Sequence, residues 1–159
     1  MTDSTPTLKA RLRTDLTASM KARDALTTGT LRMALAAVGV AEVAGDTARE
    51  LSDAEVLAVL GKEVRKRKEA ADAFAGAGRA ELADKERAES AVLTAYLPAQ
   101  LDDEELAGWV AEAVEQVAQD TGAPVTPRQM GVVVKAVQAR AAGRAEGGRI
   151  AAAVRAALA

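Results

Sequence analysis

The sequence predicts an all-α protein: an N-terminal four-helix bundle-like part followed by a small three-helix C-terminal domain. Three observations support this. Hydrophobic residues make up 49% of the 159 residues while aromatic residues make up only 2%, and alanine dominates. Alanine loses the least free energy on entering a helix. Apolar residues recur every three or four positions, which is the period of an amphipathic helix. Helix-capping patterns precede several of these periodic segments.

Four helices are expected in the N-terminal part, at about residues 6–26, 30–44, 52–75 and 80–96. The first has Thr5 as its N-cap and Pro6 at its first helical position. Thr27-Thr28-Gly29 is expected to end it. Ser52 and Glu55, three residues apart, form a capping box that opens the third helix.

Three helices are expected in the C-terminal part, at about residues 102–120, 127–142 and 149–158. Asp102 and Glu105 mark the start of the first of them, and Gly143 is the expected stop of the second. A residue before proline disfavours the helical conformation, so the chain should change direction at Pro98. We therefore expect two domains, at residues 1–98 and 99–159.

The composition excludes several classes of chemistry. The chain has no cysteine, which removes disulfides, thiol catalysis and thiolate metal sites. It has no histidine, the commonest general base and metal ligand. We expect no metal and no cofactor. The N-terminus lacks a basic and then apolar leader, so a cytoplasmic location is expected. The most apolar stretch, residues 31–44, is too short to cross a bilayer, and no membrane contact is expected.

Residues 62–74, KEVRKRKEAADAF, combine inward and outward cations. Each helical residue advances 100°, so Arg67 falls within the apolar stripe of its helix. By the same geometry Lys62, Arg65 and Lys66 point away from the stripe. The outward cations are candidates for nucleic-acid contact, although a solvated helix face explains them as well.

Two acids also fall on apolar helix faces, Glu42 and Glu89. A charge on a packing face must be paired or reach water. We expect Arg67 to form a structural ion pair with Glu42 or Glu89. The alternative interpretation is a catalytic carboxylate pair made by the two glutamates. The ion pair is favoured, because inward charges more often form satisfied pairs than active sites.

The C-terminal part separates its charges along the chain. Residues 102–120 hold seven acids and no base, whereas residues 128–159 hold six bases and one acid. Two adjacent glycines before a helix could expose N–H groups to a phosphate. This predicts a phosphate site from Lys135, Arg140, Arg144, Gly147, Gly148 and Arg149. The alternative is that these charges only offset those of the neighbouring acidic helix.

Base recognition is not expected, because three aromatic residues are too few for stacking on single-stranded bases. Recognition of a folded RNA through its shape and backbone is then the remaining nucleic-acid class, and no DNA partner is expected.

Four segments of the chain resemble the YqeY family. They are LRMALAAVGVAEV (31–43), LSDAEVLAVLGKEVRKRKEAADAFAGAGRAELADKERAE (51–89), YLPAQL (96–101) and MGVVVKAVQARAAGRAEGG (130–148). The resemblance covers nearly the whole chain. Val134 and Glu146 are small departures from the family pattern.

The resemblance implies an all-α N-terminal bundle followed by a small tail domain. That tail is similar to the tail of GatB, a subunit of the tRNA-dependent amidotransferase, which contacts the tRNA body. The expected function is therefore a non-catalytic module that interacts with tRNA. The alternative is a helical module that docks to an amidotransferase or another translation protein. Family members often carry a label of glutamine-dependent carbon–nitrogen ligase activity. This chain has no recognisable amidase signature or ATP site, so such an activity would need partner subunits.

Overall fold

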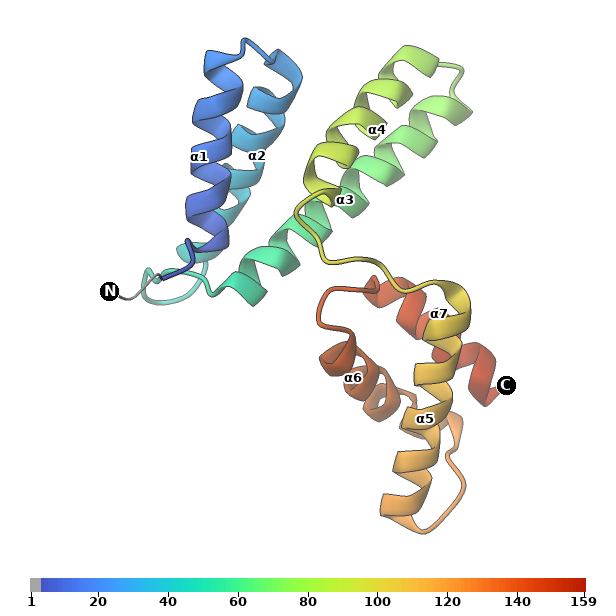
Figure 1. The fold of residues 1–159 in the computed structure, drawn as a ribbon. Helices are drawn as coiled ribbons and strands as arrows, with labels where there is room; N and C mark the ends of the chain where they lie inside the picture. The colour runs from blue at the N-terminus through green and yellow to red at the C-terminus, as the bar shows by residue number, and fades with distance from the viewer. Residues whose placement is uncertain (1–3) are drawn as a thin grey trace. The chain divides into compact units, whose positions relative to one another are not determined.

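The computed structural model describes residues 4–159 and is built of helices (Figure 1). Residues 1–3, which the expected N-terminal domain includes, lie outside the described part. No strand occurs in residues 4–159, which confirms the all-α prediction. The chain divides into two compact units, one up to Leu97 and the other Pro98–Ala159, and each is described by itself.

The N-terminal unit consists of two helical hairpins (Figure 1). The first pairs α1 (Leu8–Lys21) with α2 (Ala25–Glu42), and the second pairs α3 (Asp53–Gly76) with α4 (Ala80–Thr94). Their buried apolar side chains form one core, in which every helix takes part: Leu12, Leu31, Ala34, Val38, Val56, Leu60, Val64 and Leu93. The hydrophobic periodicity of the sequence thus corresponds to a shared core.

The predicted boundary between the first two helices was wrong. The N-cap of α1 is Thr7, whose hydroxyl accepts a hydrogen bond from the N–H of Ala10. The chain then turns at Arg23, which has a φ of 58°, and Asp24 caps α2 by accepting from the N–H of Thr27. A carboxylate in the N-cap position stabilises a helix start there, so residues 27–29 lie inside α2.

The capping box at Ser52 and Glu55 is confirmed. The Glu55 N–H donates to the Ser52 hydroxyl, and the Ser52 N–H donates to the Glu55 carboxylate. The Arg49 guanidinium also donates to this carboxylate through both terminal nitrogens, at 2.6 and 2.9 Å. These hydrogen bonds, first from Arg49 and then from the Ser52 backbone, lower the pKa of Glu55 to about 2.

The C-terminal unit packs three helices around a separate core (Figure 1). They are α5 (Asp103–Thr121), α6 (Met130–Ala141) and α7 (Gly147–Leu158), with a short 3-10 helix, η1 (Pro127–Gln129), before α6. The predicted capping box of Asp102 and Glu105 is confirmed. Buried residues from each helix form the core: Leu106, Val110, Val117, Val133, Val137, Ala141, Ile150 and Val154.

The turn between α6 and α7 has the predicted stop at Gly143, but α7 begins earlier than predicted. Helix α6 ends at Ala141, its C-cap Ala142 adopts a left-handed φ of 47°, and Gly143 follows with a φ of 87°. The two glycines at 147 and 148 form the first turn of α7 instead of preceding it, and Glu146 is the N-cap. A left-handed residue reverses the chain after a helix, and two in succession give this turn its tight course.

Candidate nucleic-acid interface

The cations of α3 divide into inward and outward groups, as the 100° spacing predicts. The Arg67 side chain is buried, with 3% of its surface exposed. Lys62, Arg65 and Lys66 are exposed. Helix periodicity alone therefore separates the structural cation from the candidates for contact with a partner.

Arg67 lies within a buried ionic cluster. Its Nη1 donates to the Glu63 carboxylate at 2.7 Å, and its Nε lies 3.4 Å from Oε2 of Glu89. Its Nη2 faces the sulfur of Met33 at 3.8 Å. Glu89 is one of the two partners expected from the sequence. The sequence interpretation missed Glu63, although its position one turn before Arg67 on the same helix face was a usable signal.

The other expected partner of Arg67, Glu42, instead contacts Lys9. The Nζ of Lys9 lies 2.9 Å from Oε2 of Glu42, and both side chains are largely buried. Of the two alternatives predicted for Arg67, the structure therefore has Glu89, because α1 brings a lysine to Glu42 at the end of α2. Glu42 and Glu89 each contact a different cation.

Among the outward cations of α3, two lysines are available to a partner. Arg65 donates from Nε to the Glu69 carboxylate at 3.0 Å. Lys62 and Lys66 form no ion pair with any residue that the structure describes. They are one helical turn apart on the same helix. We call Lys62 and Lys66 the α3 lysine pair.

Three arginines of the C-terminal unit contact other residues of that unit: Arg140, Arg144 and Arg149. Arg140 contacts the Glu112 carboxylate and stacks 4.1 Å from the centre of the Trp109 ring. Arg144 lies 5.6 Å from the same ring. Lys135 is exposed. The pair between Arg140 and Glu112 fits the prediction that charges of α5 and the later helices offset one another.

Two of these arginines also hold the chain segment that leads into α5. Arg144 donates from Nε to the carbonyl of Ala99 at 2.9 Å. Arg149 donates from Nη2 to the carbonyl of Leu101 at 3.0 Å and to the Asp103 carboxylate at 2.8 Å. Sequence reasoning could not find the contacts to Ala99 and Leu101, because a main-chain carbonyl carries no residue-specific signal.

Backbone groups complete this arrangement, which we call the linker clasp: residues 98–103 held by residues 143–149. The N–H of Leu101 donates to the carbonyl of Arg144 at 2.7 Å. A Cβ on Gly143 would lie 3.6 Å from Pro98. That distance is an ordinary contact, so glycine is favoured here by its left-handed φ of 87° and not by lack of space.

The start of α7 is poorly suited to an anion. A Cβ on Gly148 would lie 3.5 Å from the Glu146 carboxylate, so a negative charge already stands beside the first turn. A Cβ on Gly147 would lie 3.3 Å from Nε2 of Gln138. The helix dipole favours an anion at this end, but Glu146 supplies one from the chain itself.

Tyr96, in the YLPAQL segment, ties the end of α4 to α1. Its hydroxyl donates to Oδ2 of Asp15 at 2.5 Å, and Arg11 lies over its ring at 4.9 Å. Burial raises the pKa of the Tyr96 hydroxyl, and the Asp15 carboxylate raises it further. This contact accounts for the tyrosine as a structural residue.

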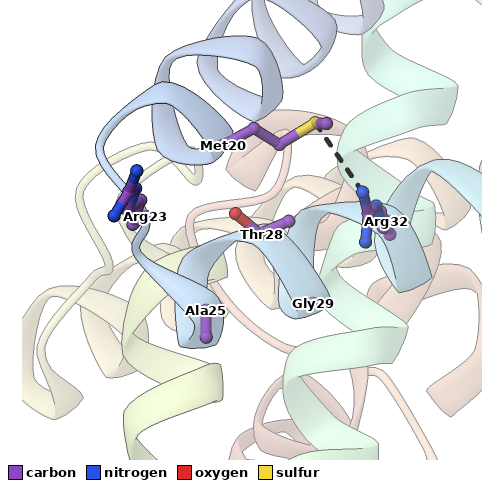
Figure 2. Close-up of a pocket in the computed structure, with 6 residues that line it drawn as sticks. All are labelled: Met20, Arg23, Ala25, Thr28, Gly29 and Arg32. Carbon is purple, nitrogen blue, oxygen red and sulfur yellow. Dashed lines mark hydrogen bonds between the residues drawn. The ribbon is translucent and has the colours of Figure 1, made fainter.

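Two hollows lie on the N-terminal unit. The larger, of about 410 Å³, is an open depression lined by Met20, Arg23, Ala25, Thr28, Gly29 and Arg32 (Figure 2). A smaller one, of about 100 Å³, lies beside Arg67 and is also lined by Met33, Lys66, Ala70, Glu86 and Glu89.

Within residues 4–159, no cluster of three or more acidic side chains is arranged to hold a metal ion. None of the described helices combines the length and apolar character needed to cross a bilayer.

The two units define an all-helical protein with exposed lysines on α3. The profile of the YqeY-like protein family matches residues 9–158, so this chain belongs to that family. An uncharacterized protein of Schizosaccharomyces pombe is 36% identical over 94 residues, which are 58% of this chain and 74% of that protein.

Proposed function

We propose that this protein is a non-catalytic accessory module that binds tRNA through phosphate contacts. The α3 lysine pair carries the proposal: two exposed lysines, one turn apart, without an ion-pair partner in residues 4–159. Lysine side chains on one face supply the electrostatic contacts that bind a nucleic-acid backbone. Lys135 of α6 is the candidate in the C-terminal unit. The resemblance of the tail to that of GatB supports tRNA as the RNA.

The contacts of the C-terminal arginines change the expected site. Arg144 donates through Nε to Ala99, and Arg149 donates through Nη2 to Leu101 and Asp103, so part of each guanidinium is engaged within the unit. These hydrogen bonds give both arginines a role in holding residues 99–103, whereas Lys62 and Lys66 have no ion pair among the described residues. We therefore assign the primary contact to α3 and give the arginines a structural role in the linker clasp.

The test is tRNA binding by the whole protein at two salt concentrations, with duplex DNA as a control. We expect binding that prefers tRNA and weakens steeply with salt. Each phosphate contact contributes about 0.9 to the slope of log K against log salt on a duplex. The double variant Lys62→Glu and Lys66→Glu should therefore bind more weakly and lower the slope by about 2.

A matched control distinguishes binding at the α3 lysine pair from a general effect of the protein's net charge. The double variant Lys21→Glu and Lys85→Glu makes the same change in net charge on other exposed helix positions of the same unit. It should bind tRNA nearly as the unaltered protein does. Equal weakening by both double variants would contradict the assignment to α3, and no binding of tRNA at low salt would contradict the function.

The second candidate is a protein-docking module for an amidotransferase or another translation protein. Large apolar side chains, such as Met33 and Val40, are exposed on α2. Exposed apolar patches are typical of protein–protein contact sites, which favours this candidate. Salt distinguishes the candidates, because an apolar contact depends weakly on salt and phosphate contacts depend on it steeply. Under either candidate, glutamine-dependent ligase activity would belong to partner subunits.

A further inference from the structure

One face of α2 is apolar and exposed along the whole helix. Met33, Val40 and Val43 expose 54%, 69% and 63% of their surface. Together with three further exposed residues they form a continuous row along the helix, which we call the α2 stripe: Leu26, Gly29, Met33, Ala36, Val40 and Val43. The opposite face of the helix packs Leu31, Ala34 and Val38 into the core.

The spacing of the α2 stripe is that of a helix–helix seam. Its members alternate at intervals of three and four residues, which are the a and d positions of a heptad. Such a seam packs best against a second helix with the same repeat. A helix face of this kind, exposed over its full length, calls for an occupant outside the N-terminal unit's own core.

We propose that the occupant is α2 of a second copy of this chain, packed antiparallel. In this register every stripe residue faces a stripe residue of the second copy, and the two residue numbers add up to 69. Leu26 then faces Val43 of the second copy, Met33 faces its Ala36, and Val40 faces its Gly29. Each large a-position residue meets a smaller d-position residue.

The surface of the unit supplies room for this packing. Gly29 carries no side chain and lines the open hollow of about 410 Å³ with Met20 and Arg32 (Figure 2). In the proposed register Val40 of the second copy lies over this hollow. The protruding valine and the depression are therefore complementary within one self-paired surface.

Charge also favours the antiparallel orientation. Near the start of α2 three bases outnumber one acid: Lys21, Arg23 and Arg32 against Asp24. Near its end three acids outnumber one base: Glu42, Asp46 and Glu50 against Arg49. An antiparallel pair places the basic end of each copy beside the acidic end of the other, and it opposes the two helix dipoles. A parallel pair would place like charges together.

The surface area that one pair of α2 helices can bury is small. Helix α2 has 18 residues and is thus about 27 Å long. One helix pair of this length buries less area than the roughly 1,600 Å² of a standard interface. We expect a weak dimer whose population rises with protein concentration.

Sedimentation equilibrium of the whole protein over a range of concentrations tests the proposal. Ala36→Glu places two carboxylates near the two-fold axis and should weaken dimerisation by about tenfold or more. Ala91→Glu, at an exposed position of α4, is the matched control and should leave it unchanged. A monomer at all concentrations, or a dimer that Ala36→Glu does not weaken, would overturn the proposal.

Cysteine crosslinking tests the register, since the chain contains no cysteine of its own. A mixture of the Leu26→Cys and Val43→Cys proteins should form a disulfide-linked heterodimer under mild oxidation. Neither variant alone should crosslink, because residues with the same number lie about 25 Å apart in the antiparallel pair. Crosslinking of either variant alone would overturn the antiparallel arrangement. Failure of the mixture to crosslink would overturn the register.

Discussion

The two units use arginine in different ways. In the N-terminal unit Arg67 is buried and contacts two glutamates, Glu63 and Glu89. In the C-terminal unit Arg144 and Arg149 lie nearer the surface and donate to main-chain carbonyls. One arginine neutralises a charge within a core, whereas the other two hold a chain segment in place.

The buried arginine needs its ionic partners, whereas the partly exposed arginines can exchange theirs for water. A buried charge without a partner is costly, so Arg67 depends on its glutamates. A partly exposed arginine that loses its partner regains water, and the cost is small. The same residue type therefore has a large effect on stability in one unit and a modest one in the other.

The largest effect is expected at Arg67. Arg67→Ala leaves the Glu63 and Glu89 carboxylates without their cation and should lower the free energy of unfolding by about 3–5 kcal/mol. Denaturant unfolding followed by circular dichroism measures it. Arg65→Ala, at an exposed position paired with Glu69, is the control and should cost less than about 1 kcal/mol. An unchanged melting temperature for Arg67→Ala would contradict the role of the cluster.

A smaller effect is expected at the linker clasp. Arg149→Ala removes a charged hydrogen bond to the Leu101 carbonyl and should cost about 1–2 kcal/mol. The single tryptophan, Trp109, lies in this unit, so its fluorescence reports this unfolding. Arg155→Ala on the same helix should cost below about 0.5 kcal/mol. Equal effects of the two substitutions would argue against the clasp.

The smallest effect is expected at the exposed capping boxes and depends on pH. Because the folded-state pKa of Glu55 is lowered to about 2, its contribution is present above the ordinary value of 4.5 and is lost as pH falls toward 2. Glu55→Gln should therefore lower the melting temperature at pH 7 more than at pH 3. Glu105→Gln in the other capping box, which has no arginine contact among the described residues, should show less pH dependence. If both variants show the same pH dependence, the contact with Arg49 is not its cause.

Much of the helical architecture could be predicted from neighbouring residues. The capping boxes at Ser52 and Asp102 are local patterns, and both are present in the structure. The inward direction of Arg67 follows from the helical period alone. The start of α2 was missed because Thr27-Thr28-Gly29 resembles a break, while Asp24 provides the stronger cap.

The helical class, most helix starts and the inward direction of Arg67 could be predicted from the sequence, because they depend on contacts within one or two turns. The partner of each charge depends instead on how the helices pack. Lys9 contacts Glu42 across 33 positions of the chain, and Arg149 contacts the Leu101 carbonyl across 48. Long charged side chains reach several neighbours, so the packing of the helices sets which one lies within hydrogen-bonding distance.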